Sequence, residues 1–439
     1  MEKKTLHSAL ILVTGSTGYI ASRLIPRLLE RGYQVRCLAR DPLQLRGRSW
    51  FRQVDVFQGD VTVPSTLPPA LQGVHTAYYL IHNMLSGHGY TERELEGARN
   101  FAMAAGTAGI EHIIYLGGLA DPEQHIAPHM RSRIETGAIL RGGKTPVTEF
   151  RAGVIIGSGS ISFEMIRFMT ELFPIVPAPG WMMNQSQPIA IQNVTDYLLA
   201  ALENPTGRGG IFEIGGPDIT TYGRLMLHYA HARGLKRRML LLPGIPLWFM
   251  AFGIGLMTPV PRPIAYALVA GLAHDSVVQH ADALRVFTDI QLIGFDEATS
   301  YALKQNEPSL VERIWEDRQR NGQTLKHEGF FIEDREMTVD APLTNAYKAI
   351  TRVIRKPQWR VEVNEQDHGI LIRDLNQRAG DKWIEWRLES NGDGTRLIQT
   401  AFFSPRGLPG FLHWYLLYPL HWLDLQILIR TIANQSKEH

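Results

Sequence analysis

One short stretch near the start of the chain has the residue types and the spacing that bind a diphosphate. An apolar run ends at Thr14, glycines follow at Gly15 and Gly18, and a helical pattern begins at Ile20. Gly15 permits a tight turn, Gly18 lets backbone N–H groups approach phosphate oxygens, and Ala21 lets the helix lie close to the strand. The helix N-terminus adds partial positive charge. We therefore predict a dinucleotide site, with an unliganded glycine-rich turn as the alternative. Its predicted residues are Gly15, Ser16, Thr17, Gly18, Tyr19 and Ile20.

The end of the second predicted strand, residues 34–40, bears on which dinucleotide is bound. An acidic residue there favours NAD by accepting from the ribose 2′-hydroxyl, and a basic residue favours NADP by pairing with the 2′-phosphate. This chain has Arg40 followed by Asp41, so both cofactors stay open. Because Arg40 is the first residue past the apolar run, we predict NADP, with NAD and a merely solvated arginine as alternatives.

The elements that must position these residues alternate in type. Strands are predicted at residues 9–13, 34–40, 54–58, 75–81, 112–116 and 146–151, with helices that include residues 90–108 and 128–140. This alternation implies right-handed crossovers and a doubly wound parallel sheet of the α/β class. Ligands gather at the carboxyl ends of such strands. We therefore include the residues at this edge in the predicted cofactor site. They are Asp60, Val61, Leu80, Ile81, His82, Gly117, Gly118, Ala152, Gly153 and Val154.

Composition excludes some classes of function. The 439 residues carry 45 basic and 43 acidic side chains, so no excess of positive charge points to a nucleic-acid partner. Cys37 is the only cysteine, which rules out an internal disulfide and suggests a reducing compartment. The first strand follows the N-terminus so closely that no signal peptide is expected, and we predict a cytoplasmic protein.

The most hydrophobic segment, residues 239–272, is divided by five prolines. Its longest proline-free piece, residues 247–258, has 12 residues, whereas a membrane-spanning helix needs about 20. Buried or interfacial helices are therefore expected rather than a spanning segment. The basic run 236–238 beside it leaves peripheral membrane contact open, although a solvated helix end is the commoner reading.

Three regions follow from the change of pattern along the chain. Residues 1–305 form the nucleotide-binding domain, whose part beyond residue 155 is predicted to be a small cap over the cleft. Residues 306–325 are a charged linker, and residues 326–439 read as a strand, a helix, further antiparallel strands and a long apolar C-terminal helix. We expect Pro419 to interrupt that last helix.

The N-terminal region resembles the atypical and extended short-chain dehydrogenase/reductase family, near its NmrA-like members. The matching pieces are Thr14–Ile20, Gly59–Val61, Arg151–Val154, Gln192–Asp196 and Phe212–Pro217. Tyr78–His82 and Tyr115–Leu119 resemble a bacterial subgroup that carries a C-terminal domain of unknown function. The resemblance implies a Rossmann fold, NAD(P) binding and an oxidoreductase activity. It extends to about residue 300.

The catalytic pattern that this resemblance implies is altered. Active members of the family carry Ser or Thr at the end of the fifth strand and Tyr-x-x-x-Lys on the next helix. Here that strand ends in Gly117 and Gly118, and His129 and Arg133 stand in the places of Tyr and Lys. His129 is a candidate proton donor and Arg133 a candidate for holding the nicotinamide ribose, but an arginine does not titrate. The alternative for His129 is a helix-surface residue at the mouth of the cleft.

The C-terminal region resembles a diverged helix-grip (START-like) domain, with residues 402–415 matching best. This α+β fold implies an apolar ligand beneath the long helix. His413, His421 and Asp424 lie on that helix, but packing is the commoner role for such residues, and no metal site is predicted.

Three functions are compatible with these observations. The first is an NADP-dependent reductase or dehydrogenase that acts on a hydrophobic small molecule. The second is a non-catalytic NADP-binding sensor or assembly factor that lacks the Tyr/Lys pair. The third, a lipid-binding or membrane-associated module, rests only on residues 239–272 and 411–433. The glycine loop supports the first two functions, the altered pair favours the second, and the oligomeric state stays open.

Overall fold

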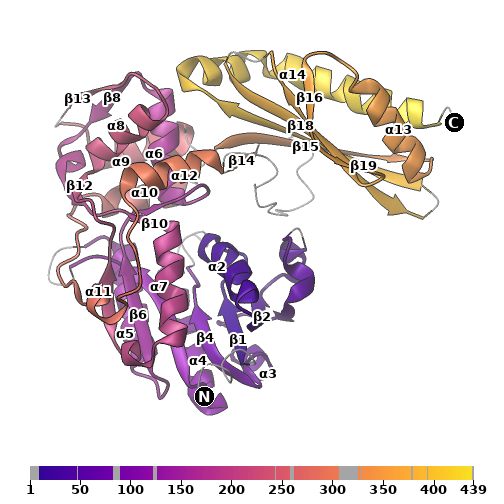
Figure 1. The fold of residues 1–439 in the computed structure, drawn as a ribbon. Helices are drawn as coiled ribbons and strands as arrows, with labels where there is room; N and C mark the ends of the chain where they lie inside the picture. The colour runs from indigo at the N-terminus through magenta and orange to yellow at the C-terminus, as the bar shows by residue number, and fades with distance from the viewer. Residues whose placement is uncertain are drawn as a thin grey trace.

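The computed structural model describes residues 9–46, 48–82, 89–121, 126–242, 244–257, 262–305, 325–327, 329–376, 379–392 and 394–437. Figure 1 shows an N-terminal α/β body, a cap of helices and short strands beside it, and a C-terminal antiparallel sheet with a long helix across it. The predicted linker, residues 306–325, lies outside the described residues apart from Leu325.

A parallel sheet organises the N-terminal body. Its strand order is β11-β6-β5-β4-β1-β2-β3, and its paired strands run parallel. The strands are β1 (Leu10–Thr14), β2 (Gln34–Ala39), β3 (Asp55–Gln58), β4 (Val74–Tyr79), β5 (His112–Gly118), β6 (Val147–Ala152) and β11 (Ile211–Ile214). The chain leaves β1 toward β2 on one side and later returns to β4 on the other. This order confirms the predicted doubly wound α/β fold and puts the reversal at β1 and β4, where such sheets bind ligands.

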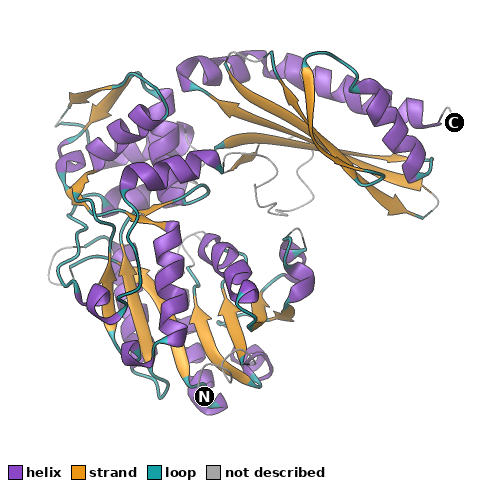
Figure 2. Ribbon diagram, in the orientation of Figure 1, coloured by secondary structure: helices purple, strands orange, loops and turns teal. Residues whose placement is uncertain are grey.

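Helices cover both faces of this sheet (Figure 2). They are α2 (Tyr19–Glu30) and α7 (Ile191–Glu203), which pack together, and α3 (Leu67–Leu71), α4 (Tyr90–Ala108) and α5 (Pro128–Arg141), which form a second group. Helix α2 shows why they pack: Ala21, Leu24 and Leu28 recur at helical spacing and are buried against the sheet. The core therefore consists of two apolar layers, one on each side of the sheet.

The fifth strand is longer than predicted. The expected end was Leu116, but β5 continues through Gly117 and Gly118, which pair with Arg151 and Ala152 of β6. The hydrogen bonds between two strands use backbone groups alone, so glycines can extend a strand when a neighbouring strand is present. The two glycines are therefore held in the sheet rather than in a loop.

The cap has a core of its own, separate from the two layers of the sheet. Its helices are α6 (Ile161–Leu172), α8 (Tyr222–Ala232), α9 (Leu247–Met257), α10 (Arg262–Gly271) and α12 (Phe295–Lys304); α11 (Asp282–Val286) packs near β11 instead. Its short strands are β7 (Ile155–Ile156), β8 (Ile175–Ala178), β9 (Gln185–Ser186), β10 (Ile189–Ala190), β12 (Thr220–Thr221) and β13 (Arg238–Leu241). In the hydrophobic segment 239–272 the predicted helices are present as α9 and α10, but its start lies in β13, which pairs with β8. None of the helices within the described residues has both the length and the apolar content needed to cross a membrane.

The C-terminal region is a separate α+β unit whose sheet carries helices on one face (Figure 2). Its strand order is β14-β15-β19-β18-β17-β16, and the pairs are antiparallel. The elements are β14 (Leu325–His327), β15 (Phe330–Val339), α13 (Leu343–Val353), β16 (Trp359–Glu365), β17 (Gly369–Asp374), β18 (Gly380–Asn391), β19 (Gly394–Pro405) and α14 (Gly407–Lys437). Side chains alternate between the two faces of β18: Ile384 and Trp386 join the core that contains α14 residues, whereas Trp383 joins a cluster with Phe330.

Helix α14 runs through Pro419 without the expected interruption. Proline removes one backbone N–H and favours a kink. Here the two halves of the helix are anchored on either side of it: Phe411 and Trp414 lie in an aromatic cluster, and Leu425 and Ile429 pack on the sheet. This packing on both sides keeps the chain helical across the proline.

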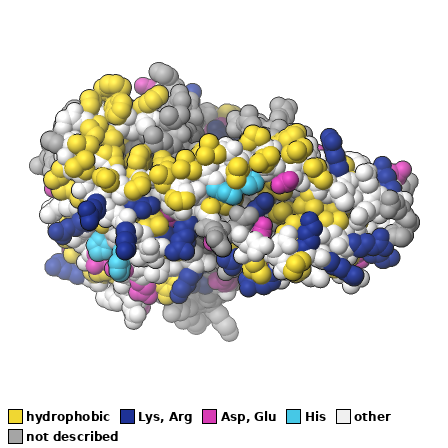
Figure 3. All heavy atoms as spheres, turned by 90° about the horizontal axis from the view of Figure 1, so that it is seen from above, with side chains coloured by type: hydrophobic (Ala, Val, Ile, Leu, Met, Phe, Trp, Pro, Cys, Tyr) yellow, Lys and Arg dark blue, Asp and Glu magenta, His cyan; other side chains and the backbone are white. Residues whose placement is uncertain are grey.

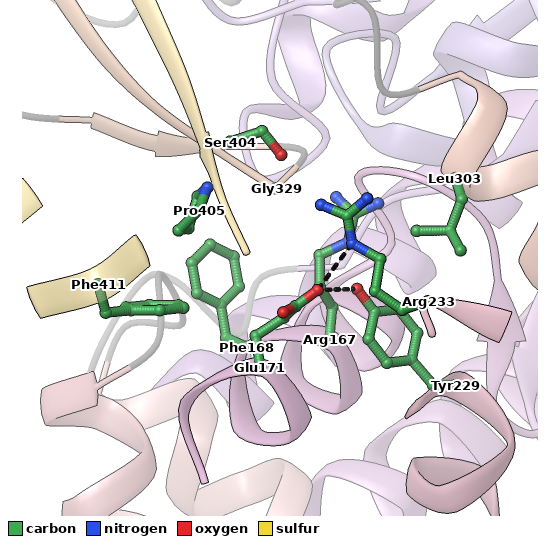
Figure 4. A pocket seen from close by; sticks show the side chains of 10 residues that line it. All are labelled: Arg167, Phe168, Glu171, Tyr229, Arg233, Leu303, Gly329, Ser404, Pro405 and Phe411. Atoms are coloured by element: carbon green, nitrogen blue, oxygen red, sulfur yellow. Dashed lines mark hydrogen bonds and ion pairs between the residues drawn. The ribbon is translucent and has the colours of Figure 1, made fainter. Parts of the chain in front are cut away.

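The cap and the C-terminal unit are joined by a buried contact around Glu171 at the end of α6 (Figure 4). Its carboxylate accepts hydrogen bonds from Tyr229 Oη at 3.0 Å, Arg233 Nε at 2.9 Å and the Gly407 backbone N–H at 2.6 Å. Gly407 begins α14, so the negative charge also lies at the positive end of that helix. The cavity beside these groups is about 10 Å³, roughly the space of one water molecule. Phe168 of α6 adds an edge-to-face contact with Phe411.

Candidate functional site

The predicted phosphate loop is a tight turn between β1 and α2. Gly15 has φ +63°, and a Cβ there would lie 2.6 Å from the Leu80 carbonyl oxygen, so only glycine fits against the end of β4. The Gly18 N–H donates to the Gly15 carbonyl at 2.8 Å, and α2 begins at the next residue. The loop and the N-terminus of α2 therefore meet at the carboxyl edge of the sheet, as the spacing predicts.

Two hydroxyl side chains hold this loop in place. Thr14 Oγ1 donates to the Tyr78 carbonyl at 3.0 Å and accepts from the Leu80 N–H at 3.2 Å, while Ser16 Oγ donates to the Leu38 carbonyl at 3.0 Å. Ser16, a predicted cofactor residue, is fully buried, and its hydroxyl ties the loop to β2. Contacts to a diphosphate would therefore come mainly from backbone N–H groups.

Two arginines bear on the cofactor edge, one exposed at the end of β2 and one buried against the glycine loop. Arg40 is exposed there, while Asp41 Oδ1 accepts from the Leu43 N–H at 2.9 Å and so caps a short turn. A second guanidinium, that of Arg48, is buried and donates from Nη2 to the Thr17 carbonyl at 3.3 Å. Arg48 was missed because nothing in its local sequence indicates that the chain folds back onto the loop.

Asp60 and Val61 lie beyond β3, and both have structural partners. Asp60 Oδ1 accepts from the Thr62 N–H and from Thr62 Oγ1, each at 2.9 Å. Val61 is buried against α4, where a Cβ on Gly97 would lie 2.7 Å from Val61 Cγ2. The Asp60 carboxylate therefore organises its own turn, and the place of Asp60 in the cofactor site stays a prediction.

A buried carboxylate lies behind the end of β4. Glu94 of α4 accepts from Ser132 Oγ at 2.8 Å, and its other oxygen lies 3.6 Å from His82 Nδ1. Burial alone would raise the pKa of Glu94, but His82, Ser132 and the charge of Arg133 outweigh it and lower that pKa. Burial, and then the charge of Arg133, lower the pKa of His82, and the Glu94 carboxylate acts in the opposite direction. Glu94 could have been found from sequence, because it is in helical register with the buried Ala98 and Phe101.

Side chains of α5 lie where the missing hydroxyl would stand at the end of β5. A Cβ on Gly118 would lie 2.6 Å from Met130 Cε and 3.1 Å from Arg133 Cδ, so these α5 side chains fill the space of a side chain there. At Gly117 a Cβ would lie 3.1 Å from the ring of Tyr115, whose hydroxyl donates to the Arg133 carbonyl at 2.8 Å. Arg133 therefore lies at the end of β5, its role in holding the nicotinamide ribose stays a prediction, and Met130 was missed.

His129 is neither exposed on the helix nor open to the cleft. It is 5% exposed, and α10 covers it so closely that a Cβ on Gly271 would lie 3.0 Å from His129 Cε1. The helix-surface alternative is therefore wrong. The burial of His129 could not be predicted, because the helix that covers it, α10, is distant in the sequence. Burial, and then the charge of Arg133, lower the pKa of His129 to about 4, so its imidazole is neutral near pH 7.

The remaining predicted residues line the edge next to β6. Ala152 accepts from the Leu119 N–H at 2.9 Å, and a Cβ on Gly153 would lie 2.7 Å from Ser276 Oγ. Val154 is buried in the cap core. The carboxyl edge thus brings together the glycine loop, Leu80–His82, the two glycines of β5 and Arg133, whereas Ser276 was not predicted.

Comparison with known families agrees with this geometry. Residues 7–167 match the NmrA-like family, and residues 317–425 match a family described as Protein of unknown function (DUF2867). The first match confirms the resemblance of the N-terminal region to NmrA-like proteins, and it covers residues 7–167 only.

Individual relatives are distant. The 3 beta-hydroxysteroid dehydrogenase/Delta 5-->4-isomerase of Mycobacterium tuberculosis is 29% identical over 135 residues, which is 30% of this chain and only 35% of that protein. The ceramide reductase of Caulobacter vibrioides is 26% identical over 53% of this chain and 73% of its own length. Citrobacter sp. triphenylmethane reductase, solved with NADP(H), superposes with a TM-score of 0.55 at 19% identity over 66% of this chain and 99% of its own. At this identity the likeness concerns the fold.

Proposed function

We propose that this protein binds NADP(H) at the Gly15–Ile20 loop and acts as a reductase or dehydrogenase of a hydrophobic small molecule. The observation that carries the proposal is the cradle at Gly15, where the approach of Leu80 leaves no space for a Cβ. A diphosphate there would lie at the N-terminus of α2, which suits its charge. The bound nicotinamide would supply the hydride, and the rest of the chemistry falls to this chain's residues.

Cofactor choice follows from charge at the end of β2. Arg40 is exposed at that edge, and Arg48 lies against the loop at Thr17. One oxygen of Asp41 is engaged by the Leu43 N–H, which makes that carboxylate less suited to accept from a ribose hydroxyl. Two guanidinium groups near one cofactor edge favour a 2′-phosphate, and therefore NADP over NAD.

The proton donor is better sought at His82 than at His129. A donor must reach the substrate, and His129 is buried beneath α10 with a pKa of about 4. His82 is only half-buried, at the end of β4, with the Glu94 carboxylate 3.6 Å behind it. Glu94 would orient the His82 ring, and Arg133 would hold the nicotinamide ribose from the end of β5.

The test of cofactor binding is a fluorescence titration with NADPH. Gly18→Glu should weaken binding by about a hundredfold or more, because a carboxylate beside the loop N–H groups repels a diphosphate by roughly 3 kcal/mol. Gly180→Glu is the matched control, since a Cβ there meets no atom within 4 Å. Equal affinities for the wild type and Gly18→Glu would contradict the site.

A second function, NADP(H) binding without turnover, is favoured by one observation. The position of the family's strand-end hydroxyl is occupied by Met130 against Gly118, and no tyrosine stands at His129. The two functions separate on NADPH consumption with a panel of hydrophobic carbonyl compounds. Turnover that His82→Asn lowers by more than it lowers NADPH affinity supports the reductase; tight binding with no turnover on any compound supports the sensor or assembly factor.

A further inference from the structure

An apolar surface extends from the cap onto the C-terminal helix. Figure 3 shows hydrophobic side chains gathered in a band over these elements on one face of the molecule. Leu416 is 74% exposed and Trp248 is 63% exposed, which is unusual for side chains of this size. We call this surface the apolar band. Its residues are Leu240, Leu241, Leu242, Trp248, Phe249, Phe252, Leu412, Tyr415, Leu416, Leu420, Trp422, Leu423 and Ile427.

Helix α14 carries two apolar faces, although packing on its own sheet requires only one. The inner face includes Phe411, Trp414 and Ile429, which are buried. The outer face has Leu412, Leu416, Leu420, Leu423 and Ile427 at intervals of three or four residues, which places them on one side of a helix. Within the described residues this outer face is exposed. A helix that served only its own domain would be polar there.

Charge around the apolar band is mainly positive. Residues 235–271 contain no Asp or Glu but four basic residues, of which Lys236 and Arg238 are exposed beside β13. On α14, Asp424 is the one acidic residue. Trp, Tyr, Phe and Leu bordered by Lys and Arg are the composition of surfaces that bind at the headgroup level of anionic membranes. A partner of high negative charge and apolar interior therefore complements this surface.

The two parts of the band are fixed relative to each other. Helix α6 of the cap packs on α14 through Phe168 and Phe411, and Glu171 binds the first N–H of α14. Arg237, next to β13, donates to the Thr170 carbonyl at 2.6 Å. The exposed residues of β13, α9 and α14 consequently form one surface, which can meet a flat partner together.

We propose that the apolar band docks on the surface of a membrane that contains anionic lipid. The aromatic and leucine side chains enter the headgroup region, and Lys236 and Arg238 pair with lipid phosphates. The attachment is peripheral, through partial insertion of side chains. It is independent of whether the N-terminal site turns over, because no residue of that site belongs to the band.

The test is sedimentation of the full-length protein with lipid vesicles. One set contains phosphatidylcholine alone and the other contains phosphatidylcholine with a quarter phosphatidylglycerol. The variant pairs are Trp248→Ser with Phe252→Ser on α9, and Leu416→Ser with Leu420→Ser on α14. The matched control is Met103→Ser, which removes a side chain that is 66% exposed on α4, outside the band.

We expect the wild type to sediment with phosphatidylglycerol vesicles more than with phosphatidylcholine alone. Each variant pair should lower the partition coefficient by about tenfold, since two partly inserted side chains are removed. Lys236→Glu with Arg238→Glu should abolish the preference for phosphatidylglycerol, and Met103→Ser should change nothing. Because the substituted side chains are exposed, unchanged thermal unfolding serves as the folding control.

Three results would overturn the proposal. The wild type stays in the supernatant with both kinds of vesicle, or both variant pairs sediment as the wild type does. The third is a stable dimer in solution that the same substitutions dissociate, because a second copy of the chain would then cover the band.

Discussion

Gly15→Ala should damage both the fold and cofactor binding. At φ +63° an alanine costs about 1 kcal/mol in backbone conformation. Its Cβ would also lie 2.6 Å from the oxygen and 2.8 Å from the carbon of the Leu80 carbonyl. Both are backbone atoms, and Thr14 Oγ1 accepts from the N–H of the same residue at 3.2 Å, so β4 cannot move freely away. Overpacking of this kind adds about 1–3 kcal/mol, for a total loss of about 2–4 kcal/mol.

The measurement is urea unfolding followed by tryptophan fluorescence, together with NADPH titration of the folded variant. Gly32→Ala is the matched control, because Gly32 also has a positive φ, +81°, but a Cβ there meets nothing within 4 Å. The control should lose only the conformational contribution of about 1 kcal/mol and keep its affinity for NADPH. The difference between the two variants isolates the contact with Leu80.

The reasoning is refuted if the two variants lose the same free energy of unfolding. It is refuted separately if Gly15→Ala is destabilised yet binds NADPH with unchanged affinity. The first result would mean that β4 does not press on the loop. The second would mean that the loop shape is not what holds the diphosphate.

Three further outcomes are expected. Glu171→Gln should lower the free energy of unfolding by about 3 kcal/mol, since a buried charge with three donors is lost, whereas the partly exposed Glu203→Gln should cost less than about 1 kcal/mol in the same urea titration. Burial lowers the pKa of His112 to about 3, so below about pH 6.5 the unfolded chain binds a proton that the folded chain does not bind. His112 should therefore lower the free energy of unfolding by about 2 kcal/mol between pH 7 and pH 5. In His112→Gln the free energy of unfolding should change less over this pH range, by the same amount. Gly118→Ala should cost about 1–2 kcal/mol because its Cβ meets Met130, and a double-mutant cycle with Met130→Ala should show that the two losses are not additive.

Much of the fold could be predicted because its signals are local. The phosphate loop depends on glycines within four positions, Gly15 and Gly18, and α4 begins and ends at the residues predicted for it, 90 and 108. Alternating strands and helices then permit few topologies, which is why the parallel sheet followed from the sequence. Predictions failed where contacts between distant residues outweighed a local preference. Pro419 was expected to break α14, but packing on both sides of it maintains the helix.

The candidate site divides in the same way. Its cofactor side, the Gly15 loop and the strand ends, could be located from spacing alone, because parallel strands present their carboxyl ends at one edge. Its reactive side was decided by contacts between residues far apart in the chain. Gly271 of α10 buries His129, Met130 fills the space at Gly118, and Glu94 approaches His82 from another helix.

The sequence by itself therefore determined what kind of molecule this is: a doubly wound sheet with a glycine turn shaped for a diphosphate, joined to a second α+β unit. Tertiary structure alone decided which side chains are buried, which are charged and which face outward. The physical reason is that a glycine turn or the alternation of side chains in a strand depends on a few neighbouring residues. Desolvation of a side chain, in contrast, depends on every segment that packs nearby. For the same reason the sequence shows only that the C-terminal helix is apolar, whereas the folded protein shows that its outer leucines lie on the surface.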